Sequence, residues 1–172
     1  MTAPRKLLVD TRGVAASEMV LVLPMVAFIT LNVVDLATYM YSKMQVDLAA
    51  QQAVGVVRQL CTATPAPPGS SCNAEYSTQM TDAAQKTALG AAVTLVGART
   101  KEDRYCADTD GKLELAGASD RDCSGAIAGS TAAPGTYLSV QSSYAFSSVF
   151  PQASIASLLG SPITSTAWIR LK

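Results

Sequence analysis

The stretch VAASEMVLVLPMVAFITLNVV, residues 14–34, decides the fold of this 172-residue chain. Its only charged side chain is that of Glu18. Because a helix rises about 1.5 Å per residue, a stretch of this length crosses a hydrocarbon layer of about 30 Å. The sequence therefore predicts a membrane-spanning helix over residues 14–35. Asp35 is expected to mark its end, with the carboxylate at the outer lipid interface.

The charges ahead of this stretch predict its orientation. They are Arg5, Lys6 and Arg12 against Asp10. Since positive residues favour the cytoplasmic side, we expect the N-terminus in the cytoplasm and everything after residue 35 outside. An ordinary secretory signal, cut near Ala49 and Ala50, is the alternative. The length of the apolar run, the presence of Pro24 and the helical pattern that continues to residue 60 disfavour it.

Beyond the membrane stretch, apolar residues recur at intervals of three and four. They are Val46, Ala50, Ala53, Val57 and Leu60. This spacing places them on one face of a helix, and polar residues occupy the other positions. We therefore predict one long helix over residues 14–60, whose outer part, 36–60, is a spine that packs against a folded domain. The Pro-rich stretch 65–68 ends it.

Four cysteines follow the apolar stretch, which suits an oxidising compartment for the C-terminal part. They are Cys61, Cys72, Cys106 and Cys123. Their spacing lacks the close pairs of a zinc site, so two disulfides are expected. Of the three pairings that four cysteines allow, we favour the sequential one, since it closes two short loops, each worth about 3 kcal/mol. The sequence alone leaves the other two pairings open.

The C-terminal part, 61–172, is expected to be a small disulfide-bonded α+β domain. A second helix is predicted over about 74–96, broken or frayed near Gly90, with a strand at 91–96 as the alternative. Alternating apolar residues predict an antiparallel pair of strands near 138–146 and 163–171. The segment between them, Ile155 to Leu159, is expected to cover one end of the sheet.

Two loops complete this domain in the prediction. Asp108-Thr109-Asp110-Gly111 resembles the start of a calcium loop but lacks the later carboxylates, so a turn is expected. Residues 117–135 are rich in small and polar residues and predict an exposed loop that Cys123 ties down.

Composition argues against several classes of function. The chain has 13 Lys and Arg, 13 Asp and Glu, and no His. Balanced charge gives no field that would attract nucleic acid. The absence of His removes the commonest general base and the commonest zinc ligand. We therefore predict no catalytic residue, no metal site and no cofactor, and we rank an extracellular enzyme as a third, weaker class.

The string RGVAASE, residues 12–18, joins the basic leader to the apolar stretch. A glycine can lie extended and close to a protease, and a cut after Gly13 would free the amine of Val14. A carboxylate in an apolar segment is costly unless it is paired, and that amine could pair with Glu18 on the same or a neighbouring chain. The string resembles a type IV prepilin leader, residues 1–13, with Glu18 as the fifth residue of the product. In pilins this glutamate is thought to register incoming subunits.

Several features together resemble the TadE-like pseudopilins of the tight adherence (Flp pilus) system. They are GVAASE, the run LVLPM, the spine and the closing strand TSTAWIR. TadF-like and TadG-like proteins are the alternatives within that system. The resemblance implies a minor pilin of a type IVb pilus, needed for pilus assembly, adhesion and biofilm formation.

The same resemblance implies partners and a location. The partners are other pilin and pseudopilin subunits, a prepilin peptidase, the inner-membrane assembly platform and membrane lipid. The location is the bacterial inner membrane, crossed once, with the C-terminal domain periplasmic or extracellular, or incorporation in the pilus. The rival hypothesis is an uncleaved, signal-anchored binding module outside the cytoplasm.

Overall fold

The computed structural model describes residues 12–63, 71–97, 100–117, 121–151 and 154–171. The fold is α+β, as predicted, with a long apolar helix, a second helix, an antiparallel sheet and two disulfides. Its contacts form two compact units. One comprises residues up to Met40 together with Ser147–Gly160, and the other comprises Tyr41–Phe146 and Ser161–Lys172. Residues 1–11 of the expected leader lie outside the described residues.

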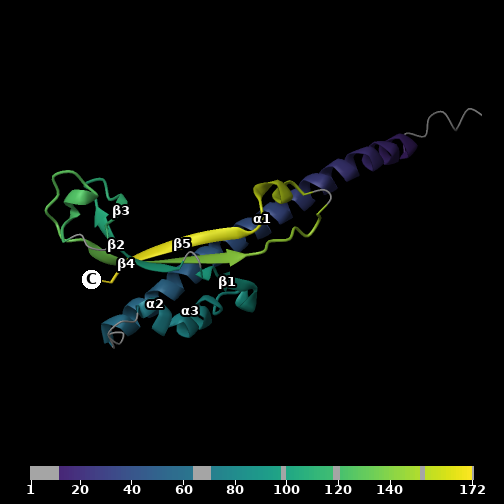
Figure 1. Ribbon diagram of the computed structural model, residues 1–172. Coiled ribbons are helices and arrows are strands. Elements are labelled where there is room, and N and C mark those ends of the chain that lie inside the picture. Colours follow the sequence, from purple (N-terminus) through teal and green to yellow (C-terminus); the bar gives the residue numbers. More distant parts are fainter. Residues whose placement is uncertain (1–11, 64–70, 98–99, 118–120, 152–153, 172) are drawn as a thin grey trace, which may run out of the picture. The chain divides into compact units, whose positions relative to one another are not determined.

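Helix α1, Arg12–Ala63, is continuous and contributes to both units (Figure 1). Its bounds agree with the predicted helix over 14–60. Pro24 is the one proline inside it. The helix ends shortly before Pro65, because a proline disfavours helical conformation in the residue before it.

The second unit has its core on one face of α1. Residues 46, 50, 53 and 57 of the helix are all fully buried there, as predicted for the spine face, whereas Leu60, its fifth predicted member, is half-buried. The core cluster consists of Ala49, Ala53, Val54, Val57, Met80, Ala84, Val93, Leu138 and Val140. The spine contributes mainly Ala and Val to this cluster. Such small side chains let a helix approach its neighbours closely, and the larger Met80 and Leu138 fill the space between the elements.

The predicted second helix is shorter than expected. The structure has α2, Cys72–Glu75, and α3, Ser77–Ala84, followed by a 3₁₀ turn η1, Gly90–Ala92. Helix α3 already ends at Ala84, before the break predicted near Gly90, and Gly90 has a φ of 56°, which a residue without Cβ adopts readily. The alternative strand is the one present, as β1, Val93–Leu95.

The sheet is wholly antiparallel and is centred on β4, Gly135–Tyr144. The predicted pair is β4 with β5, Ile163–Arg170, in which buried or half-buried residues alternate with exposed ones. Along its other edge β4 pairs with β2, Lys101–Ala107, and with β1. The short strand β3, Leu113–Leu115, extends the sheet from β2.

The turn expected at residues 108–111 joins β2 to β3. The Asp108 carbonyl accepts the N–H of Gly111 at 2.9 Å, and Gly111 has a φ of 76°. Within the described residues, no group of three or more His, Cys, Asp or Glu could hold a metal ion. The Asp-Gly pair is therefore a hairpin turn in this structure.

The segment η4, Ile155–Leu159, belongs to the first unit and contacts α1, where Asn32 and Tyr39 bond its backbone. The connection between β4 and β5 is thus part of the first unit, and its predicted place at one end of the sheet stays a prediction.

Candidate functional site

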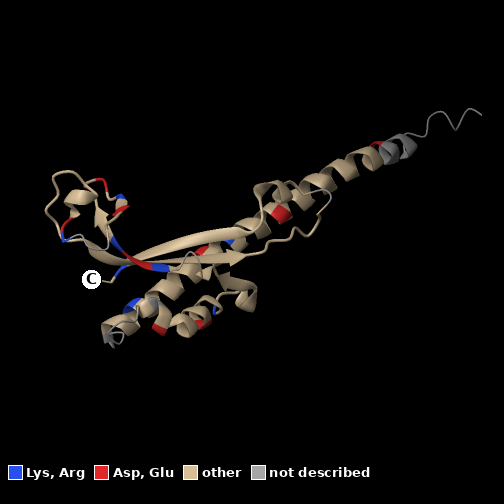
Figure 2. Cartoon of the chain, viewed as in Figure 1, with Lys and Arg blue, Asp and Glu red and all other residues tan. Residues whose placement is uncertain are grey.

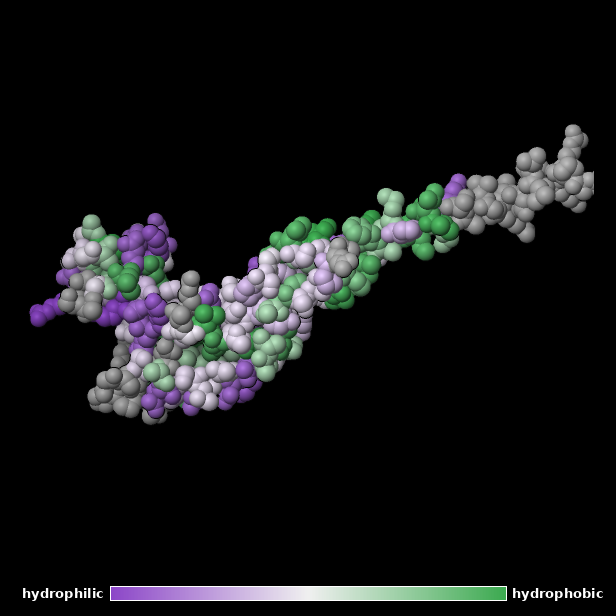
Figure 3. Space-filling view, turned by 45° about the vertical axis from the view of Figure 1, so that its right-hand side comes forward, coloured by the Kyte–Doolittle hydropathy of each residue, from purple (hydrophilic) through white to green (hydrophobic). Residues whose placement is uncertain are grey.

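The N-terminal half of α1 exposes apolar side chains on all of its faces. Those with large exposed surfaces between residues 19 and 36 are Met19, Val20, Leu21, Val22, Leu23, Met25, Val26, Phe28, Ile29, Leu31, Val33, Val34 and Leu36. Figure 3 shows hydrophobic residues gathering along this part of the helix, and Figure 2 shows how few charges it carries. A helix that is apolar all round is stable only when it is buried in protein or lipid. Within the described residues, α1 is the one helix long and apolar enough to cross a membrane, and it is a candidate membrane anchor.

Polar side chains in this half of α1 bond to the helix itself. The Thr30 hydroxyl donates to the carbonyls of Val26 and Ala27, at 3.0 and 2.8 Å. The Asn32 amide donates to the Phe28 carbonyl at 2.9 Å. These local bonds satisfy donors that would otherwise be unpaired in lipid, so the two residues are compatible with a membrane-facing helix.

The predicted processing site lies at the start of α1. The backbones of Gly13 and Val14 are in its first turn, whereas their side chains are outside what the structure describes. Glu18 follows one turn later and is exposed, about 6 Å along the axis from Val14. No described residue pairs with the Glu18 carboxylate, so its registering role stays a prediction.

A cluster that the sequence did not reveal lies where the apolar run ends. We call Asn32, Asp35 and Tyr39 the polar clamp. Their spacing of three and four residues places them on one face of α1. All three bond to residues of the segment 147–160, which is far away in sequence.

Asp35 is the centre of the polar clamp. Its two carboxylate oxygens accept the N–H groups of Val149 and Phe150, at 2.9 and 3.3 Å, and the Ser154 hydroxyl bonds to it as well. The side chain is fully buried. The expectation that Asp35 simply reaches the outer interface is therefore corrected, because its carboxylate points into the protein and holds a loop.

The other two residues of the polar clamp fix the loop on either side of Asp35. The Asn32 side-chain oxygen accepts the N–H of Ile155 at 2.8 Å. The Tyr39 hydroxyl donates to the Leu159 carbonyl at 3.4 Å. The sequence held one signal for the polar clamp, namely polar residues spaced by three and four positions at the end of an apolar helix. Their partners could not be predicted, because main-chain groups carry no sequence signature.

Comparison with known protein families gives a match within α1. Residues 13–54 match the family model described as TadE-like protein. The predicted resemblance is confirmed. No curated protein and no solved structure was found to match the chain. The TadE-like segment contains Gly13, Glu18 and the polar clamp, whereas the loop that the clamp holds lies outside it.

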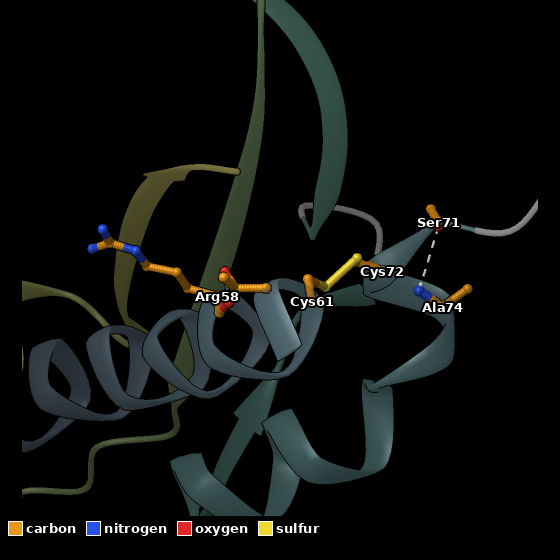
Figure 4. Close-up of a disulfide and its surroundings, with 6 residues drawn as sticks. Arg58, Cys61, Ser71, Cys72 and Ala74 are labelled. Carbon is orange, nitrogen blue, oxygen red and sulfur yellow. Dashed lines mark hydrogen bonds between the residues drawn. A yellow bond between two sulfur atoms is a disulfide. The ribbon is translucent and has the colours of Figure 1, made fainter. Parts of the chain in front are cut away.

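Beyond the TadE-like segment, two disulfides tie the domain together. The structure joins Cys61 to Cys72 and Cys106 to Cys123, which is the sequential pairing. Figure 4 shows the first, which links the last turns of α1 to the start of α2. The Ser71 hydroxyl accepts the N–H of Ala74 at 3.4 Å and caps α2.

The second disulfide forms its own small cluster. Cys106 and Cys123 are buried together with Ala116, and Ile127 packs against them. Asp122 caps the short 3₁₀ helix η3, Cys123–Gly125. Hydrogen bonds from the Ser124 hydroxyl and N–H hold the pKa of the Asp122 carboxyl below its usual range. Cys123 lies in the loop predicted at 117–135, so the disulfide ties that loop to β2.

Proposed function

We propose that this chain is a minor pilin or pseudopilin of a tight adherence (Flp) type IVb pilus. The observation that carries the proposal is α1, a continuous helix that is apolar and exposed in its first half and packed on a folded domain in its second. The TadE-like match covers both halves. The family points to a pilus-associated structural protein and not to an enzyme.

The proposed organisation follows the same helix. Residues 1–13 are the leader, 14–35 span the bacterial inner membrane, 36–60 are the outer spine, and 61–172 fold outside the cytoplasm. The basic leader supports an inward N-terminus. The two disulfides support an oxidising location for the domain.

Processing between Gly13 and Val14 converts the anchor into a subunit. The new amine would lie about 6 Å along the helix from Glu18, and a carboxylate in the first turn is favoured by the helix dipole. In lipid, Glu18 needs a positive partner, and the amine of a neighbouring subunit supplies one. This pairing would register subunits as they join.

The spine offers a second contact for neighbouring subunits. Tyr41, Met44 and Leu48 repeat at three and four residues and are 52%, 63% and 43% exposed. They form an apolar stripe that this chain leaves about half exposed. Helices of other pilin and pseudopilin subunits, or of the inner-membrane assembly platform, would cover such a stripe. Adhesion and biofilm formation would then depend on the assembled fibre.

The mass of the mature chain tests processing. A product that begins at Val14 supports the proposal, an intact Met1 supports the uncleaved binding module, and a start near residue 51 supports an ordinary secreted protein. Gly13→Leu should block the cut, since a bulky side chain hinders approach of the peptidase. Gly55→Leu is the matched control, because nothing lies within 4 Å of a Cβ at that position and processing should continue.

Assembly is tested separately from processing. Glu18→Ala should leave membrane insertion and folding intact but abolish incorporation into the pilus. Glu75→Ala, at an exposed carboxylate of α2, is the control and should incorporate normally. Normal incorporation of Glu18→Ala would remove the registering role.

A further inference from the structure

We propose that the segment 147–160 is a membrane-interface element that inserts its apolar side chains into the outer leaflet beside α1. The proposal rests on the membrane anchoring proposed above and adds a second point of contact with lipid. The partner of these apolar side chains is the lipid bilayer. Four observations on this segment support it.

The first observation is composition. Residues 147–162 read SSVFPQASIASLLGSP and contain no charged residue. In the described part of the segment, Leu158 is 82% exposed, and Val149, Ile155 and Leu159 are exposed as well. Exposing large apolar side chains to water is unfavourable. Transferring them to a lipid surface lowers the free energy.

The second observation is the position of the segment along α1. About 20 helical residues cross a hydrocarbon core, so a span that begins near Val14 ends near Val33. The polar clamp, at residues 32 to 39, therefore lies at the outer boundary. Because the clamp bonds Val149, Phe150, Ile155 and Leu159 directly, it holds the segment at this depth.

The third observation is that main-chain polar groups of the segment have partners. Asp35 and Asn32 accept three of its N–H groups, and Tyr39 donates to the Leu159 carbonyl. The N–H of Ala156 donates to the Ser154 hydroxyl at 3.1 Å. Unpaired backbone groups are what normally keep loops out of lipid, and here four N–H groups and one carbonyl of the segment are bonded within the protein.

The fourth observation is an apolar hollow between the segment and α1. It has a volume of about 270 Å³ and is lined by Phe28, Ile29, Asn32, Val33, Leu36 and Ile155. The hollow continues the exposed apolar surface of the anchor onto the loop. At this depth the apolar surfaces of α1 and of the segment would both face lipid acyl chains, and an acyl chain would fill the hollow.

Depth-dependent fluorescence quenching tests the proposal in the full chain. The chain has one tryptophan, so Trp168→Phe provides a dark background. Leu158→Trp is added in that background, and the protein is placed in phosphatidylcholine vesicles that carry nitroxides at shallow or deep positions. We expect Leu158→Trp to lose intensity with the shallow nitroxide more than with the deep one.

Two further tryptophans give the controls. Leu115→Trp, on β3, replaces a leucine that is 62% exposed and should keep its intensity with both lipids. Phe28→Trp, in the anchor, should be quenched by the deep nitroxide. If Phe28→Trp is quenched and Leu158→Trp behaves like Leu115→Trp, the segment does not enter lipid and the inference is overturned while the anchor stands. If Phe28→Trp is also unquenched, the proposed anchoring fails together with the inference.

Discussion

The disulfide between Cys106 and Cys123 should stabilise one region of the domain and leave the rest unaffected. Its cluster contains Cys106, Ala116 and Cys123 and shares no residue with the main core. Replacing both cysteines by alanine avoids burying a new polar group. We expect this double variant to loosen residues 113–132 and to leave the spine as stable as before.

The magnitude follows from the length of the loop. The cysteines are 17 residues apart, and the chain-entropy model assigns such a crosslink about 3.1 kcal/mol. Since about 1.36 kcal/mol is a factor of ten, the local opening equilibrium should rise by about 200-fold. The amides that report it are those of Ala116, bonded to the Arg104 carbonyl at 2.9 Å, and Cys123, bonded to the Ala132 carbonyl at 2.8 Å.

Hydrogen exchange measured by mass spectrometry on the full chain is the assay. Peptides over 113–132 should exchange about 200-fold faster, and peptides over 46–57 should not change. The matched control replaces Cys61 and Cys72, whose separation of 11 residues predicts about 2.8 kcal/mol. That variant should affect α2 and not Ala116. Equal acceleration of the spine in the first variant would refute the idea that its cluster is a separate unit of stability.

Three further predictions follow from single side chains. Met80→Ala should lower the free energy of unfolding by about 2–5 kcal/mol, because Met80 is 2% exposed in the main core, whereas Leu158→Ala should change it by less than about 0.5 kcal/mol in denaturant titrations. Asp35→Ala leaves the Val149 and Phe150 N–H groups without their acceptor, so proteolysis within 147–160 should accelerate, and an unchanged rate would argue against the clamp. Asp122 has a lowered pKa, so its stabilising effect on residues 121–127 is present at neutral pH and lost as the pH falls below about 4. Asp122→Asn should remove that acid-dependent loss of exchange protection.

The long helix and the central pair of strands could be predicted because local pattern decides them. The spacing of apolar residues along 46–60 and their alternation with polar residues along 163–170 both indicate which side chains face the core. The strands β2 and β3 could not be predicted in the same way. Residues 101–104 are Lys, Glu, Asp and Arg, which show no apolar alternation, and they form a strand because β4 offers them a partner in register.

The second helix was overestimated for a related reason. Alanine-rich sequence favours a helix, but α3 ends at Ala84, and Val93 is fully buried in the core as part of a strand instead. Tertiary pairing outweighed local propensity there. Asp35 was underestimated, because a lone carboxylate after an apolar run has the same appearance whether it faces water or holds a loop. Only the fold brings residues 147–160 to it.

The hydrogen bonds of Asp35 also set an order of events during synthesis. Its partners Val149 and Phe150 lie 114 and 115 residues later in the chain. At translation rates of about 5–20 residues per second, those two residues are synthesised on the order of ten seconds after Asp35. Asp35 is therefore made long before its partners. Helix α1 cannot be bonded to residues 147–160 until the chain has been synthesised as far as Phe150.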